Sequence, residues 1–110
     1  MDSHFETDVQ AQGQARVIAV RGELDLAVAG TFRDELSAAL GSGAVEIIID
    51  LERLQFIDST GLGALVNAQQ EATSAGCTLG VINPAPQVMR LLELTGLTDR
   101  LLLRRNGADG

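Results

Sequence analysis

Two patterns of hydrophobic and polar positions occur along this chain, and they predict different kinds of element. Runs in which apolar residues alternate with polar ones, or follow one another in short β-branched stretches, predict strands. These runs cover residues 5–9, 16–20, 45–49, 54–57, 77–82 and, as a last strand or a simple apolar run, 101–103. Apolar residues spaced four apart predict amphipathic helices instead. The helical segments cover residues 27–40, a stretch from Asp58 to Gly76, and a stretch from Pro86 to Gly96.

Glycine and helix-capping residues fall where the predicted elements end. The pattern predicts that Gly22 ends the second strand and that Asp50-Leu51 ends the third. The Gly-Ser-Gly segment 41–43 stops the first helix, and Asn83-Pro84 turns the chain before the last one. The run 45–49 is typical of a strand buried on both faces. Because strands and helices alternate, the fold class is α/β, with right-handed crossovers between neighbouring parallel strands.

Length and composition favour one globular domain. A chain of 110 residues is long enough for one hydrophobic core and too short for two. We therefore expect a single domain over residues 1–105 and a flexible polar tail over 106–110. No apolar run approaches the roughly 20 residues that a membrane span requires. No basic start precedes an apolar stretch, so we expect no secretory signal and a cytoplasmic protein that does not contact the membrane.

Charge and residue types exclude several functions. Fifteen acidic residues against eight basic ones, all of them Arg, give a net charge of -7, which argues against direct nucleic-acid binding. The single Cys77 and the single His4 are too few for a structural zinc site, and we expect neither metal nor cofactor. Without a Lys the chain has no phosphate-binding loop, so autonomous nucleotide hydrolysis is not expected.

The segment Asp58-Ser59-Thr60-Gly61-Leu62-Gly63 carries the most functional information. Asp is a usual helix cap, and Ser59 falls on the first helical residue, where unpaired backbone N–H groups and the positive end of the helix dipole converge. This position favours a phosphate group. Taken alone, however, the motif more often marks an ordinary hydroxyl at a helix start.

Neighbouring residues of this segment have both structural and functional interpretations. Asp58 accepts N–H bonds at the helix start or, as the less favoured interpretation, orients Ser59 during phosphate transfer. Asp25 follows a strand and can cap the first helix. Gly61 and Gly63 either give the helix a thin face that another backbone approaches, or pack closely on the protein's own sheet.

Five short motifs occur together along the chain, in the order Gly22-Glu23-Leu24-Asp25, Asp50-Leu51, the Asp58 segment, Asn83-Pro84 and Leu94-Thr95-Gly96-Leu97. Together they resemble the landmarks of the STAS domain family, and in particular of the single-domain bacterial anti-sigma factor antagonists. The resemblance runs from about Arg16 to Leu103. It implies a STAS fold, which is a small mixed sheet of four or five strands with helices packed mainly on one side.

The resemblance implies a regulatory function and no enzymatic activity. An unphosphorylated antagonist binds an anti-sigma factor serine kinase of the ATPase-kinase superfamily and so releases a sigma factor. Phosphorylation of the serine directly after the Asp, here Ser59, ends the antagonism, and a metal-dependent serine phosphatase restores it. Thr60 lies about 100° further around the helix, so we do not expect it to accept phosphate. The implied partner-binding residues are Asp25, Asp58, Ser59, Thr60, Gly61, Leu62 and Gly63.

Two other functions stay open at this point. One is a cytoplasmic STAS subunit or regulator of a membrane lipid or anion transporter, in which the serine helix docks on the transporter without being phosphorylated. The other is an enzyme that uses Ser59 as a nucleophile. The enzyme is disfavoured because no His, Lys or complete oxyanion motif lies nearby in the sequence.

Overall fold

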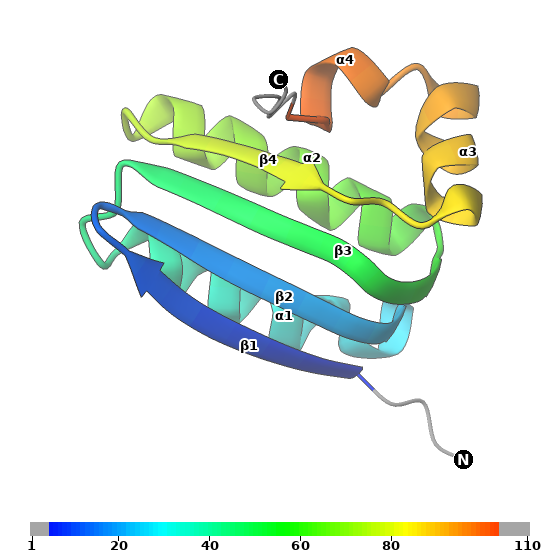
Figure 1. Cartoon of the computed structure of the whole chain (residues 1–110), viewed down its shortest axis with the longest axis horizontal. Helices are drawn as coiled ribbons and strands as arrows, with labels where there is room; N and C mark the ends of the chain where they lie inside the picture. The colour runs from blue at the N-terminus through cyan, green and yellow to red at the C-terminus, as the bar shows by residue number, and fades with distance from the viewer. Residues whose placement is uncertain (1–4, 104–110) are drawn as a thin grey trace.

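A mixed four-stranded sheet lies at the centre of the computed structural model, which describes residues 5–103 (Figure 1). The strand order is β1-β2-β3-β4; β1 is antiparallel to β2, and β2, β3 and β4 are parallel to one another. The elements are β1 (Phe5–Gln12), β2 (Ala15–Leu24), α1 (Leu26–Leu40), β3 (Glu46–Ile57), α2 (Ser59–Ser74), β4 (Thr78–Ile82), α3 (Pro86–Thr95) and α4 (Thr98–Leu101). The predicted α/β class and mixed sheet are confirmed. His4 and the predicted tail 106–110 lie outside the described residues.

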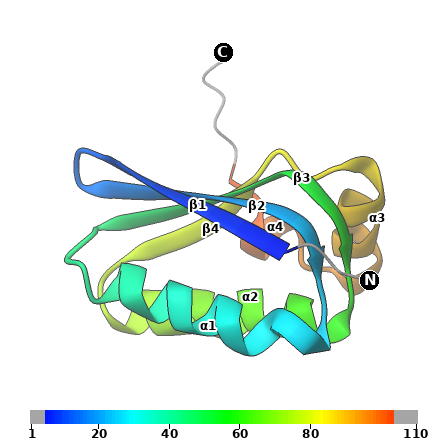
Figure 2. The same cartoon turned by 90° about the horizontal axis from the view of Figure 1, so that it is seen from below.

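The helices are distributed unevenly around the sheet. The two long helices, α1 and α2, lie side by side against one face (Figure 2), whereas α3 and α4 lie beyond the β4 edge (Figure 1). The core fills the space between the sheet and the long helices, and its buried side chains include Ile18, Ile49, Phe32, Leu36 and Leu65. The prediction of helices mainly on one side is confirmed. Within residues 5–103, no helix is both long and apolar enough to cross a bilayer.

Strand β3 is one strand of 12 residues, whereas the sequence predicts two shorter ones separated at Asp50-Leu51. This prediction is wrong because the strand continues through two irregularities, at each of which β3 has one more residue than β2. Each extra residue reverses the alternation of side chains and bends the strand. Core residues therefore stop alternating and recur at every third position, at Leu51, Leu54 and Ile57. Figure 2 shows β3 bending towards α2 at this end.

Strand β2 also continues further than the sequence predicts. Gly22 does not end it; the strand reaches Leu24. Gly22 has φ 95°, a conformation that glycine adopts without a steric penalty, and one irregularity in the pairing with β3 follows it directly. The glycine bends the strand instead of ending it. As a result β2 and β3 finish at the same edge, with Leu24 opposite Ile57.

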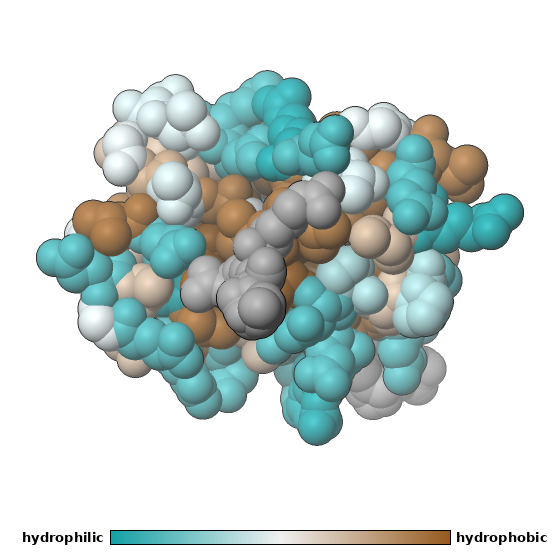
Figure 3. Space-filling view, turned by 45° about the horizontal axis from the view of Figure 1, so that its top comes forward, coloured by the Kyte–Doolittle hydropathy of each residue, from teal (hydrophilic) through white to brown (hydrophobic). Residues whose placement is uncertain are grey.

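Of the two alternatives for residues 101–103, a last strand or a simple apolar run, the structure shows no regular strand. Leu101 ends α4, and Leu102 makes only an isolated parallel bridge with Val81. Leu103 then packs on Gly80, where a side chain would collide with it. Gly80 is the register partner of Ile48, so Leu103 covers this part of the face opposite α1 and α2. Figure 3, seen obliquely from the β4 edge, shows hydrophobic side chains in the middle of the view and hydrophilic ones around them.

A substitution of Phe32 tests the core between the sheet and α1. Phe32 is fully buried, and its ring packs edge to face against that of Phe5, with 6.0 Å between the ring centroids. We predict that Phe32→Ala lowers the free energy of unfolding by about 3–5 kcal/mol, because it removes a buried ring and leaves a cavity. Leu94→Ala, at a side chain that is 73% exposed, should stay within about 0.5 kcal/mol of the wild type. Urea unfolding of the three proteins measures both values, and equal losses would contradict the described core.

Candidate functional site

The parallel pairing of β2 with β3 brings two helix starts together. Parallel strands present their carboxyl ends at the same edge of a sheet, and here each of the two strands is followed by an Asp and then by a helix. Asp25 stands between β2 and α1, and Asp58 stands between β3 and α2. The candidate site is therefore a pair of adjacent strand-Asp-helix units, and Figures 1 and 2 show α1 and α2 starting at the same end of the sheet.

Asp58 binds to the start of both helices. One carboxylate oxygen, Oδ1, accepts a hydrogen bond from the backbone N–H of Gly61 in α2 at 2.8 Å. The other, Oδ2, accepts from the backbone N–H of Leu26 in α1 at 3.2 Å. The backbone N–H of Asp58 also donates to the carbonyl oxygen of Leu24 at 3.2 Å. A single carboxylate thus caps its own helix and ties the neighbouring helix to it.

Asp25 has the simpler arrangement of an ordinary cap. Its Oδ1 accepts from the backbone N–H of Ala27 at 3.0 Å, and its carbonyl oxygen accepts from Val28 at 3.1 Å. The sequence indicates a cap at each Asp. It does not indicate that the bond from Leu26 crosses to Asp58, because the two residues are 32 positions apart in the chain.

Ser59 is the first residue of α2, as predicted, and it is exposed. Its hydroxyl makes no hydrogen bond with any other part of residues 5–103, so it is available to a reagent from solution. Thr60, the second hydroxyl of the motif, is half-buried. The two hydroxyls therefore differ in exposure as well as in direction around the helix.

The remaining motif residues divide into buried and open positions. Gly61 is buried, and a Cβ there would lie 2.5 Å from the carbonyl oxygen of Leu24 and 3.0 Å from Cγ1 of Ile57. Leu62 is only 6% exposed and belongs to the core. Both residues pack α2 on the protein's own sheet, which is the second of the two interpretations that the sequence allows for Gly61. Gly63 is different, since a Cβ there would meet nothing within 4 Å.

One surface residue of this region is missing from the sequence-based set. Leu26, the first residue of α1, has a side chain that is 74% exposed, although it is apolar. The sequence contains a signal for it. Leu26 directly follows the capping Asp25 and lies outside the four-residue spacing of apolar positions that runs from Val28 to Leu40.

The described part of the chain offers neither a metal site nor a reactive thiol. Residues 5–103 contain no group of three or more His, Cys, Asp or Glu side chains that could hold a metal ion. Cys77 is buried, and its burial, with a smaller effect of the Glu46 carboxylate, raises the pKa of the thiol above its ordinary value. A buried thiol with a raised pKa is a poor nucleophile.

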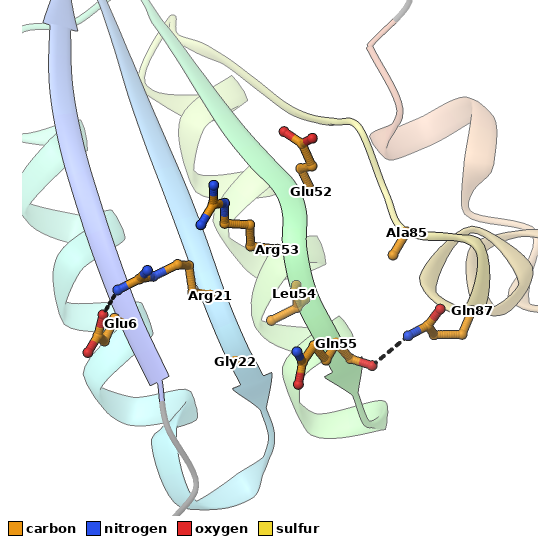
Figure 4. A pocket seen from close by; sticks show the side chains of 9 residues that line it. All are labelled: Glu6, Arg21, Gly22, Glu52, Arg53, Leu54, Gln55, Ala85 and Gln87. Atoms are coloured by element: carbon orange, nitrogen blue, oxygen red, sulfur yellow. Dashed lines mark hydrogen bonds and ion pairs between the residues drawn. The ribbon is translucent and has the colours of Figure 1, made fainter.

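A shallow hollow of about 650 Å³ lies beside the carboxyl-terminal half of β3 (Figure 4). It is lined by residues of β1, β2, β3 and the start of α3, and none of them belongs to the predicted site. Two contacts join residues that line it. Arg21 forms an ion pair with Glu6, and the side-chain amide of Gln87 donates a hydrogen bond to the carbonyl oxygen of Gln55. The hollow is therefore partly closed by contacts within the chain, and we assign it no function.

Comparisons with known proteins agree in identifying one family. A family model described as "Mlab, STAS domain" matches residues 7–104. An anti-sigma F factor antagonist of Lysinibacillus sphaericus is 32% identical over 95 residues, which cover 86% of this chain and 80% of that protein.

Solved structures agree with the sequence matches. The anti-sigma factor antagonist SpoIIAA in its unphosphorylated form matches with a TM-score of 0.76 and 29% identity, over 91% of this chain and 86% of that one. The Bacillus cell fate determinant SpoIIAA in its phosphorylated form matches with a TM-score of 0.70 and 28% identity, over 91% and 89%. The residues that the family model matches, 7–104, include both long helices and the whole candidate site.

The two glycines of α2 should respond to the same substitution in opposite ways. We predict that Gly61→Ala destabilises the protein by about 1–3 kcal/mol, because the added methyl group collides with the end of β2. Gly63→Ala should stabilise it by up to about 1 kcal/mol, because Ala favours a helix and the methyl group meets nothing. Chemical unfolding of both variants measures the difference. If Gly61→Ala were as stable as Gly63→Ala, the close packing of α2 on Leu24 would be refuted.

Proposed function

The chain belongs to the STAS domain family of anti-sigma factor antagonists, and we propose that phosphorylation of Ser59 switches its antagonism off. In its unphosphorylated form the protein binds an anti-sigma factor serine kinase of the ATPase-kinase superfamily, which then releases its sigma factor. The kinase transfers the γ-phosphoryl group of ATP to the Ser59 hydroxyl, with loss of the hydroxyl proton and release of ADP. A metal-dependent serine phosphatase removes the group and restores binding.

The exposed and unbonded hydroxyl of Ser59 is the observation that carries this proposal. It stands on the first turn of α2, while Gly61 and Leu62 behind it are packed on the sheet. A kinase therefore meets a hydroxyl on a firmly held helix start and needs no local unfolding to reach it. Phosphorylated and unphosphorylated forms of the relative SpoIIAA agree with a switch of this kind.

Charge explains why phosphorylation would end binding. A phosphoserine adds about -1.5 to -2 charges at neutral pH to a chain whose net charge is already -7. The added anion lies next to the Asp58 carboxylate, and docking of a partner would remove water from both. An unpaired charge buried at an interface costs several kcal/mol, whereas a neutral hydroxyl costs little. Binding is therefore far more sensitive than folding to this modification.

The partner surface in this proposal consists of the exposed Ser59 and the half-buried residues around it. Asp25, Asp58, Thr60 and Gly63 lie at or near the two helix starts, and Gly63 leaves room for close approach of another backbone. The chain itself acts as substrate and ligand, and the kinase supplies ATP and its metal ion. The proposal further includes the cytoplasm as the compartment, since ATP-dependent kinases and sigma factors act there. It also includes a single domain over residues 1–105.

Two substitutions of Ser59 separate the loss of the hydroxyl from the gain of charge. We predict that Ser59→Ala binds the cognate anti-sigma kinase as tightly as the wild type, while Ser59→Asp binds at least tenfold more weakly, about 1.4 kcal/mol. Alanine removes the phosphate acceptor without adding a charge, and aspartate adds a charge at the docking surface. Isothermal titration calorimetry measures both affinities. Wild-type affinity in Ser59→Asp would refute a charge-based switch at this residue.

Phosphate transfer should be specific for one hydroxyl. With cognate kinase and Mg-ATP, we predict one phosphate per chain, on Ser59 and not on Thr60, because Ser59 is exposed and Thr60 is half-buried and turned around the helix. Intact-mass measurement gives the number of phosphates, and tandem mass spectrometry gives the position. Ser59→Ala serves as the control and should take up none. A phosphate on Thr60, or one retained in Ser59→Ala, would overturn the assignment.

A further inference from the structure

The side chain of Leu26 is apolar and exposed, and it adds nothing to the core. Within residues 5–103 it is the most exposed of the large hydrophobic side chains, at 74%. The core-facing residues of α1 are Ala29, Phe32, Leu36 and Ala39. At 100° per residue, Leu26 lies in line with Gly30 and Arg33 on the solvent side of the helix. The geometry of α1 therefore directs Leu26 outwards.

The backbone of Leu26 is nevertheless firmly held. Its N–H donates to Oδ2 of Asp58, and the residues on either side are held by the Asp25 cap. A side chain on a fixed backbone loses less freedom on binding than one on a mobile segment. Leu26 thus has the two properties of an interface anchor, which are exposed apolar surface and an ordered position.

Leu26 is also directly coupled to the proposed phosphorylation site. The carboxylate that accepts its N–H belongs to Asp58, which immediately precedes Ser59. Other apolar side chains are exposed as well, and single exposed ones are normal on a protein surface. Leu94 on α3 is equally exposed, at 73%, but no hydrogen bond within residues 5–103 joins its backbone to Asp58 or Ser59. Exposure alone therefore does not distinguish Leu26, whereas its attachment to Asp58 does.

We propose that Leu26 is the apolar anchor by which the anti-sigma factor holds this protein, and that Asp58 fixes it relative to Ser59. This inference rests on the proposed function of Ser59. The anchor enters an apolar pocket of the anti-sigma factor. Because Leu26 is bonded to the residue directly before Ser59, a phosphate on Ser59 would lie close to the rim of this pocket, so the partner that the Ser59 switch controls is the occupant. Leu26 is then a residue that determines partner specificity, and Asp58 is a positioning residue.

Two variants of Leu26 and one matched control test the anchor. Leu26→Ala removes most of the apolar side chain, and Leu26→Gln keeps its length but makes it polar. Both keep good helix formers at an exposed position, so their melting temperatures should match that of the wild type. By titration calorimetry with the purified anti-sigma factor, both should bind at least tenfold more weakly. Leu94→Ala, with equal exposure on α3, should bind as the wild type does.

A double-mutant cycle tests the role of Asp58. Asp58→Asn keeps the size of the side chain but leaves one acceptor oxygen for two backbone N–H groups. Asp58→Asn should weaken binding several-fold in the wild-type background and by a smaller factor in the Leu26→Ala background, since the anchor that it positions is already gone. The backbone amide of Leu26 should also shift in the NMR spectrum of Asp58→Asn. Equal effects in both backgrounds would overturn the positioning role.

The outcomes separate this inference from the proposed function. If the wild type binds, Ser59→Asp weakens binding, and Leu26→Ala behaves like Leu94→Ala, then Leu26 is not the anchor and the Ser59 switch stands. If Ser59→Asp binds like the wild type while both Leu26 variants lose affinity, the anchor stands and the charge switch fails. Absence of binding by the wild type would overturn both.

Discussion

The parallel pairing of β2 with β3 is the constraint on which the site depends. It brings two strand ends to one edge, with Leu24 opposite Ile57, and each strand end leads through an Asp into a long helix. Asp58 then closes the arrangement, since its two oxygens satisfy one backbone N–H from each helix. Unpaired N–H groups at a helix start are costly when they are shielded from water, so a carboxylate that serves two helices stabilises both the fold and the surface around Ser59.

Local patterns in the sequence predict most of the fold, and they fail where the sheet is irregular. The periodicity of α1 and the cap of α2 depend on neighbouring residues, so both helices are predicted within one residue of their observed starts. The length of β3 is not predicted correctly. At two irregularities β3 has one residue more than β2, and the spacing of its core positions changes from every second to every third residue. Gly22 is likewise misread, since a positive φ ends some strands and bends others.

The same distinction applies to the candidate site. Position Ser59 is predictable, because strand, cap and helix follow one another within a few residues. The bond from Leu26 to Asp58 is not, because it joins residues 32 positions apart and depends on the register of the sheet. The burial of Leu62 and Gly61 depends in the same way on where the bent end of β3 meets α2. A family motif indicates which positions matter, whereas only the packed structure separates those that face outwards from those that face the core.

The close packing of Gly61 on Leu24 has a consequence for how long a phosphorylation signal would last. The backbone of α2 at Gly61 packs so closely on Leu24, at the end of β2, that no room is left for a side chain. Under the proposed switch, the two functional states would then differ in a covalent bond and its charge, and hardly in shape. Such a protein has no separate conformation that persists after the phosphate is removed. The lifetime of its signal would be set entirely by the enzymes that add and remove the phosphate, and its own thermal motion would not erase it.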